Sequence, residues 1–284
     1  MPKPPQAIQD TVALGLSWIV ALLLMGMFLW LIGDIVAHGL SGLSWEFFTS
    51  APMNAGREGG IAPILVSTML ILVVCMIVAL PIGLGAAILL SEVTHQFGKV
   101  GHLVRRSLDV LAGIPSIVFG LFGNAFFCVA LGLGFSIVSG GLTLACMVLP
   151  ILIRSTEEGF RALPTDYRLS AAALGLSQTS TLVSLLIPAA MPALLSGFIL
   201  GLGRAIAETA ALIFTSGYVD RMPESLWDSG RALSIHIYDL SMNVPGGNAN
   251  AYASALVLIM LLFVINAGAQ IIGHRWSSKR VLAT

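Results

Sequence analysis

The stretch that decides the fold is an uncharged run of 44 residues, Val110–Ile153, which reads VLAGIPSIVFGLFGNAFFCVALGLGFSIVSGGLTLACMVLPILI. A helix that crosses about 30 Å of hydrocarbon needs about 20 apolar residues, so this run is long enough for two membrane spans. The segment Gly-Leu-Gly at 132–134 lies near its middle and is typical of a turn between them. The run therefore predicts a helical membrane protein with more than one span.

Long uncharged runs recur along the rest of the chain. Charged residues make up 10% of the 284 residues and hydrophobic residues 57%, whereas soluble domains have about 25% charged residues. The formal net charge is zero, so we expect no strongly basic surface for nucleic acid. The composition excludes a soluble enzyme, a nucleic-acid binder and a disordered chain. The other uncharged runs are Thr11–Gly33, Gly59–Ser91, Leu169–Gly203 and Ser241–Gly273.

These runs predict an all-α polytopic membrane protein with six transmembrane helices in a single domain, residues 1–284. A cytoplasmic hairpin is favoured for the fourth connection because Thr181–Ile187 is too short to cross a membrane and is flanked by Pro188 and Pro192. A seventh span through 170–190 is the alternative. We place the spans at 12–35, 62–90, 110–131, 136–153, 191–216 and 252–273, the cytoplasmic hairpin at 154–190 and a periplasmic loop at 217–251.

Lysine and arginine residues discriminate between the two topologies. With six spans and the N-terminus inside, ten basic residues lie on the cytoplasmic side and three outside, while Arg204 falls within a span. This distribution satisfies the positive-inside rule, and we therefore expect both termini in the cytoplasm. Seven spans would place the basic C-terminal tail outside. The inner set is Lys3, Lys99, Arg105, Arg106, Arg154, Arg161, Arg168, Arg275, Lys279 and Arg280, and the outer set is Arg57, Arg221 and Arg231.

The sequence carries none of the common signatures of catalysis, metal binding or nucleotide binding. It has no G-x-x-x-x-G-K-[ST] phosphate loop, no H-E-x-x-H zinc motif and no G-x-S-x-G nucleophile elbow. The five histidines lack metal-ligand spacing. We therefore expect no enzyme activity, no metal and no cofactor in this chain.

Arg204 and Glu208 are charges inside a predicted span, in the segment GLGRAIAET at 201–209. Four residues apart, they share one helix face. A charge at the bilayer centre costs about 2.5–3.5 kcal/mol on insertion scales, whereas an i,i+4 helix pair contributes only about 0.3–0.5 kcal/mol. One interpretation is a packing ion pair. The other is that Arg204 lines a polar pathway and binds an oxyanion through two parallel hydrogen bonds, with Glu208 orienting the guanidinium.

The predicted hairpin contains the segment LPTDYRLSAAALGLS at 163–177, followed by LLIP at 185–188. This pattern is typical of a helix, a break at Gly175 and a second helix that ends before Pro188. A plain connector fits the composition, and so does an element that docks into a partner's groove. The segment resembles the coupling loop of bacterial ABC importer permeases, whose pattern is E-A-A-x-x-x-G followed by I-x-L-P. Leu169 and Ser170 stand in place of its first two residues.

Two further motifs narrow the resemblance to the permeases of phosphate-import ABC transporters. The segment AGIPSIVFGLFG at 112–123 is similar to the signature of their third span, and RAIAETA at 204–210 resembles their R-A-x-G-E-T-A element. The similarity runs from about Gly59 to the C-terminus. The residues after the second motif, Thr209–Ser216, are more similar to a PstA-type subunit than to its PstC-type partner.

The resemblance implies the type I permease fold of ABC importers and a role in ATP-driven import of inorganic phosphate across the bacterial inner membrane. It implies four kinds of partner: a homologous PstC-type permease subunit, two cytoplasmic ATPase subunits that bind ATP and dock on the hairpin, a periplasmic phosphate-binding protein, and the lipid bilayer. The substrate-pathway residues would be Arg204, Glu208, Thr209 and Ser116, although the Ser116 hydroxyl could instead bond its own helix. The residues implied in ATPase coupling are Arg168, Ala171, Ala172, Ala173, Gly175 and Pro188.

Two other functions stay open from the sequence. One is an ABC permease for another oxyanion, such as sulfate or molybdate. The other is a membrane scaffold without transport activity, which would leave the charges at 204 and 208 unexplained.

Overall fold

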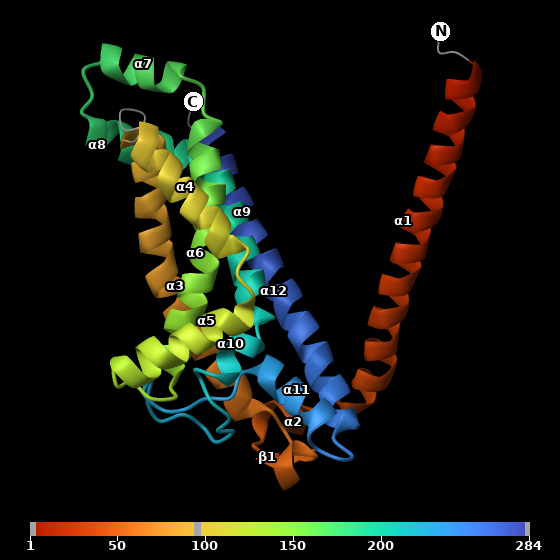
Figure 1. The fold of residues 1–284 in the computed structure, drawn as a ribbon. Coiled ribbons are helices and arrows are strands. Elements are labelled where there is room, and N and C mark those ends of the chain that lie inside the picture. The colour runs from red at the N-terminus through yellow and green to blue at the C-terminus, as the bar shows by residue number, and fades with distance from the viewer. Residues whose placement is uncertain (1–3, 94–97, 282–284) are drawn as a thin grey trace.

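The structure is a computed structural model that describes residues 4–93 and 98–281, and it is built almost entirely of helices (Figure 1). Within this described part, five helical segments are long and apolar enough to cross a membrane. Two further helices, bent against each other by 100°, make a sixth candidate if the pair counts as one span. The all-α polytopic fold expected from the sequence is confirmed.

The elements have the following bounds. The longer helices are α1 (Pro4–Gly39), α3 (Ala62–Ile88), α4 (Gly98–Ala112), α6 (Ile137–Arg161), α9 (Ile187–Ile206) and α12 (Asn248–Val281). The shorter helices are α2 (Trp45–Thr49), α5 (Ser116–Gly123), α7 (Asp166–Ala173), α8 (Gln178–Thr181), α10 (Ala210–Ile213) and α11 (Leu233–Met242). Short 3₁₀ turns are η1 (Leu40–Gly42) and η2 (Asn54–Gly56), and π-helical turns are η3 (Leu89–Val93), η5 (Asn124–Ala130) and η6 (Leu182–Leu186). Strands β1 (Pro52–Met53) and β2 (Glu58–Gly59) pair antiparallel.

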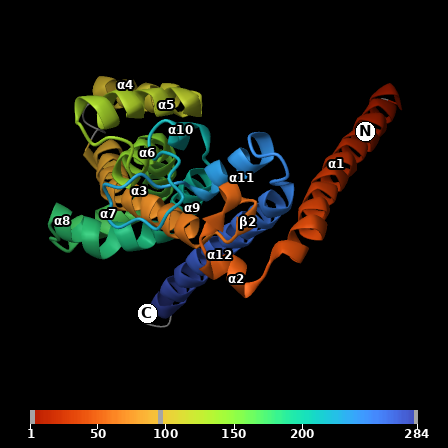
Figure 2. The same cartoon turned by 90° about the horizontal axis from the view of Figure 1, so that it is seen from below.

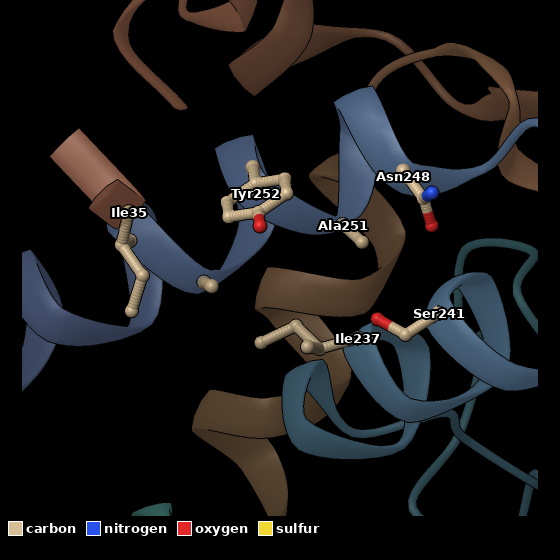
Figure 3. A pocket seen from close by; sticks show the side chains of 7 residues that line it. Ile35, Ile237, Ser241, Asn248, Ala251 and Tyr252 are labelled. Carbon is tan, nitrogen blue, oxygen red and sulfur yellow. The ribbon is translucent and has the colours of Figure 1, made fainter. Parts of the chain in front are cut away.

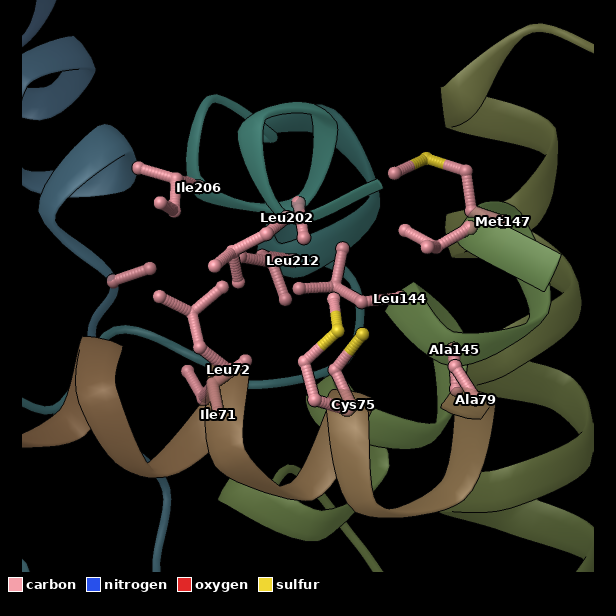
Figure 4. Close-up of a cluster of buried hydrophobic side chains, with 14 of the residues drawn as sticks. Ile71, Leu72, Cys75, Ala79, Leu144, Ala145, Met147, Leu202, Ile206 and Leu212 are labelled. Atoms are coloured by element: carbon pink, nitrogen blue, oxygen red, sulfur yellow. The ribbon is translucent and has the colours of Figure 1, made fainter. Parts of the chain in front are cut away.

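Helices α3, α6 and α9 form the centre of the bundle. Ile71 and Cys75 of α3, Leu144 of α6 and Leu202 of α9 are buried in one apolar cluster and point toward one another (Figure 4). Small residues allow the close approach: a Cβ on Gly197 of α9 would lie only 2.9 Å from the Cβ of Ser155 on α6. Packing of apolar side chains and close backbone contacts therefore hold these three helices together.

The third span expected at 110–131 is broken and not one helix. Helix α4 begins before it and ends at Ala112, and the chain turns by 100° before α5 begins. Pro115 precedes α5 in an extended conformation (φ −58°, ψ 141°) and disfavours a helical residue before it. Helix α4 extends well before the uncharged run because two of its charged side chains pair with α6: Arg105 Nε donates to Glu157 Oε1 at 2.6 Å, and Asp109 pairs with Arg154.

The helical segment that is a candidate for the fifth span runs over Gln178–Ile206, whereas the sequence places this span at 191–216. Pro188 and Pro192, at which helix ends are expected, lie inside this helical segment. Proline lacks an amide hydrogen and its ring clashes with the carbonyl four residues earlier. The π-turn η6 comes directly before Pro188, with the Ile187 amide bonded to the Leu182 carbonyl, and this wider turn accommodates the ring.

The hairpin is shorter than the 154–190 expected, because α6 continues to Arg161 and the next membrane-length segment begins at Gln178. Only α7 and its flanking turns remain between these two helices. Residues 178–190 of the alternative seventh span at 170–190 belong to the same candidate segment, Gln178–Ile206, as the residues that follow them. The spans expected at 12–35, 62–90, 136–153 and 252–273 each lie within a helical segment of the structure.

The two ends of the molecule differ in their elements. Helices α7 and α8, the first turns of α1 and the last turns of α12 lie at one end, and α2, β1, β2 and α11 lie at the other (Figure 1). Arg168 of α7 bonds the Phe160 carbonyl near the end of α6, so the basic residues Arg161 and Arg168 of the predicted inner set belong to the end that carries α7. Lys3 lies outside the described residues.

Helix α1 stands clear of the central bundle along most of its length (Figures 1 and 2). It meets α12 near its end, where the Tyr252 hydroxyl donates to Asp34 Oδ2 at 3.1 Å. A cavity of about 270 Å³ lies beside this contact, between α1, α11 and α12 (Figure 3). Its lining residues are Ile35, Ile237, Ser241, Asn248, Ala251, Tyr252 and Ala255.

Candidate functional site

The charged pair singled out by the sequence lies where α9 ends. Arg204 is in the last turn of α9, and the chain leaves the helix through Ala207, Glu208 and Thr209 before α10 begins. The guanidinium Nη2 and Glu208 Oε2 are 3.6 Å apart, with 48% of the arginine side chain exposed and only 4% of the glutamate. The pair is therefore at a backbone break and not in the middle of a continuous span.

Glu208 holds this break in place with its side chain and its backbone. Its Oε1 accepts a hydrogen bond from the Ala211 amide at 3.3 Å, which caps the start of α10. Its carbonyl accepts the Ser234 hydroxyl of α11 at 2.6 Å. Thr209 makes no side-chain cap at this position. Because the Glu208 carboxylate accepts the Ala211 amide and lies 3.6 Å from the guanidinium, the five donors of Arg204 exceed what this one carboxylate can accept, which leaves donors for a ligand.

Helix α5 packs tightly against α10, and this brings the motif at 112–123 beside the break. A Cβ on Gly120 would lie 2.9 Å from the Cα of Ala211. Asn124 Nδ2 donates to the Phe214 carbonyl at 2.8 Å, which fixes the chain after α10 to the end of α5. Ser116, half-buried, is the first residue of α5. The structure thus assembles the two motifs, far apart in sequence, into one region.

The arrangement suits reversible binding of an anion. A guanidinium presents five donors in a planar fork, which matches the oxygens of a tetrahedral oxyanion. A carboxylate 3.6 Å away balances the charge of Arg204 but lies beyond ordinary hydrogen-bond distance. A permeation site must also release what it binds, and a neighbouring carboxylate that competes for the guanidinium favours release.

The turn after α7 has the glycine geometry that the sequence indicates. Gly175 has φ +70°, in the left-handed region. The Leu176 amide bonds to the Ala171 carbonyl and the Gly175 amide to the Ala172 carbonyl, each at 3.0 Å, which is a Schellman motif. Ala171 is buried, whereas Ala172 and Ala173 are exposed, and Leu174 is 78% exposed. The hairpin therefore presents an apolar tip.

Arg168 and Pro188, two of the residues implied in ATPase coupling, are not at this tip. Arg168 turns back and donates two hydrogen bonds to Glu92, from Nε at 3.0 Å and from Nη2 at 2.6 Å. Donation to the Glu92 carboxylate raises the pKa of Arg168 above its ordinary value. Pro188 lies within the fifth span. Sequence reasoning does not find Glu92; the only signal is its position as the first charge after the run Gly59–Ser91.

Comparison with known proteins defines the class of this chain. Residues 79–278 match the family described as the binding-protein-dependent transport system inner membrane component. This match covers more than half of the chain, so the protein belongs to that family of ABC importer permeases.

Individual relatives narrow the comparison. A probable ABC transporter permease protein, YqgI of Bacillus subtilis (strain 168), is 31% identical over 94% of this chain and 95% of the relative. The phosphate transport system permease protein PstA 1 of Mycobacterium tuberculosis (strain ATCC 25618 / H37Rv) is 30% identical over 94% of this chain and 87% of its own length. PstA of Mycobacterium leprae (strain TN) is 32% identical over 88% and 83%. The resemblance to phosphate-import permeases is therefore confirmed.

Solved structures confirm the fold. An inward-facing structure of the MetNI methionine ABC transporter matches with a TM-score of 0.59 and 16% identity, over 76% of this chain and 94% of that one. A bacterial ABC transporter involved in the import of the polysaccharide alginate matches with a TM-score of 0.58 and 12% identity, over 94% and 99%. At such identities the likeness establishes the type I permease fold.

Proposed function

We propose that this chain is the PstA-type permease subunit of an ATP-driven importer of inorganic phosphate. It sits in the bacterial inner membrane with both termini in the cytoplasm. It pairs with a homologous PstC-type subunit, and the phosphate pathway lies between the two. Two ATPase subunits bind ATP and dock on the hairpin around α7, and a periplasmic phosphate-binding protein delivers phosphate at the opposite end. Alternating access moves the anion across.

The observation that carries this proposal is the half-exposed guanidinium of Arg204 at a backbone break, facing one buried carboxylate at 3.6 Å. A lipid-facing arginine would be expensive, so an exposed one at this position favours a polar pathway. The relatives named as phosphate permeases support phosphate as the anion. The relative from Bacillus subtilis is described only as a probable ABC transporter permease, and it leaves room for another oxyanion.

Replacement of Arg204 tests the proposal. In the reconstituted complex, Arg204→Ala should lower phosphate uptake by about 10- to 100-fold, because it removes charge-assisted hydrogen bonds to the anion. Arg204→Lys should retain part of the activity. The matched control is Arg221→Ala, which removes an exposed arginine from the outer loop and should leave uptake unchanged.

Competition identifies the anion. Arsenate should inhibit uptake of labelled phosphate, whereas sulfate and molybdate should not. Inhibition by sulfate or molybdate equal to that by arsenate would instead favour a permease for those oxyanions. Full uptake by Arg204→Ala would remove this residue from the mechanism.

A further inference from the structure

The ion pair between Arg168 and Glu92 joins the exposed hairpin to a membrane-spanning helix. Arg168 lies on α7, and Glu92 lies in η3, the π-turn that follows α3. Beside its two bonds to Glu92, the Arg168 Nη2 also donates to the Phe160 carbonyl of α6 at 3.1 Å. The two side chains are 32% and 21% exposed, so both are partly shielded from water. A bidentate pair of this kind fixes orientation as well as distance.

Other ion pairs at this end connect different elements. Arg105 of α4 bonds Glu157 of α6, and Arg154 of α6 pairs with Asp109 of α4. These two pairs fasten membrane-associated helices to each other. The pair of Arg168 with Glu92 is different because one partner belongs to α7, the helix that presents the apolar tip.

Helix α3 connects this ion pair to the broken-helix site. Near its other end, the buried Thr68 hydroxyl accepts a hydrogen bond from the Leu233 amide of α11 at 2.9 Å. The next residue, Ser234, donates to the Glu208 carbonyl at 2.6 Å. Glu208 in turn caps α10 and faces Arg204. Hydrogen bonds, helix α3 and the 3.6 Å ion pair between Glu208 and Arg204 thus form a continuous series of contacts from the hairpin to the guanidinium.

We propose that Glu92 and Arg168 form a positioning pair that, through α3, links displacement of the hairpin by a docked ATPase to the backbone break that carries Arg204. This inference rests on the proposed function of the chain as an ABC permease. The pair makes no contact with the transported anion. Its role is to keep α7 and α3 moving together, so that ATP hydrolysis is followed by a change at the site.

The first test measures phosphate transported per ATP hydrolysed in proteoliposomes that contain the complete complex and the binding protein. Glu92→Gln keeps the side-chain shape but removes its charge, and it should lower this ratio about tenfold, the upper part of the range for residues that link two sites. The exchange Glu92→Arg with Arg168→Glu should restore at least part of the ratio. Asp109→Asn, which breaks an ion pair of α4 with α6, should change it by less than about twofold.

A purely structural role would give a different result. In that case Glu92→Gln would lower the amount of assembled complex that co-purifies with the ATPase subunits, and the complexes that remain would transport with the normal ratio. That outcome would overturn the proposal.

The second test does not depend on the identity of the substrate. In complexes whose three native cysteines are replaced, an impermeant maleimide reports the accessibility of Arg204→Cys with and without ATP and vanadate. The labelling rate should respond to nucleotide when Glu92 is present and should not respond in Glu92→Gln. An equal response in both would overturn the positioning pair. A normal response in these complexes, together with no phosphate uptake by the complex that retains Arg204, would refute the proposed substrate and leave the positioning pair standing.

Discussion

At the scale of the residue, the end of α9 gives Arg204 and Glu208 different surroundings and leaves the arginine accessible to a ligand. The sequence indicates the pair and its spacing correctly. The break in the chain beside it is a tertiary feature, because Glu208 bonds the Ala211 amide and the Ser234 hydroxyl and not the next turn of α9. As a result, Glu208 is buried while Arg204 stays half-exposed. A continuous helix would give both side chains the same surroundings.

His236 is a second residue whose behaviour depends on its surroundings. It lies buried on α11 under Gly56, and its Nδ1 has no hydrogen-bond partner within the described part of the chain. Burial lowers the pKa of His236 from 6.5 to about 4, with Arg231 adding to the effect and Asp239 opposing it. As the pH falls, the unfolded chain therefore binds a proton on this histidine before the folded chain does.

This difference predicts a pH-dependent stability. The contribution of His236 is fully present above about pH 6.5 and is lost progressively down to about pH 4, by about 3 kcal/mol in total. His236→Leu removes the titrating group and should make the melting temperature of the purified protein less sensitive to pH over that window. A variant whose melting temperature falls as steeply as that of the unchanged protein would contradict the buried, neutral state of His236.

At the scale of the element, two substitutions at Gly175 distinguish the effect of backbone strain from the effect of a lost contact with the ATPase. A Cβ at Gly175 would meet no atom within 4 Å, but any L-residue there must adopt φ +70°. Gly175→Ala should therefore cost about 1–2 kcal/mol of local stability and still allow assembly. Gly175→Glu carries similar strain and adds a bulky charge at the docking tip, so it should abolish the stimulation of ATP hydrolysis by the permease. Measured ATPase rates of the two complexes distinguish these effects, and equal stimulation by both variants would argue against docking at this turn.

The helix boundaries are the element-scale feature that sequence reasoning handles least well. Prolines 188 and 192 predict a helix end, yet the helix continues because the π-turn η6 makes room for the first ring. The charges of α4 predict the end of an apolar span, yet two of them, Arg105 and Asp109, form ion pairs with α6 and the helix continues. In both places the local sequence predicts that a helix ends, but the helix continues because contacts or a wider turn elsewhere in the structure accommodate the proline or the charge.

At the scale of the whole molecule, the arrangement predicts which surfaces face each compartment. The turn after α7 and the loop that leads to α11 lie at opposite ends of the molecule (Figure 1). Each carries an exposed apolar residue, Leu174 in the first and Trp227 in the second. The excess of basic residues near the α7 end predicts that this end faces the cytoplasm. In intact cells an impermeant maleimide should therefore label Trp227→Cys, and it should label Leu174→Cys only after permeabilisation. Labelling of Leu174→Cys in intact cells would reverse the proposed orientation.

The amino-acid sequence by itself determines that this protein is a bundle of apolar helices with a glycine turn at 175 and a charged pair at 204 and 208. These properties depend on composition and on spacing along one helix, which are local. Only the tertiary structure decides where the fifth span begins, that the third span is bent by 100°, and that Arg168 is bound by Glu92. Those features depend on groups that are distant in the chain, because a broken backbone or a shielded charge is stable only where another element satisfies it.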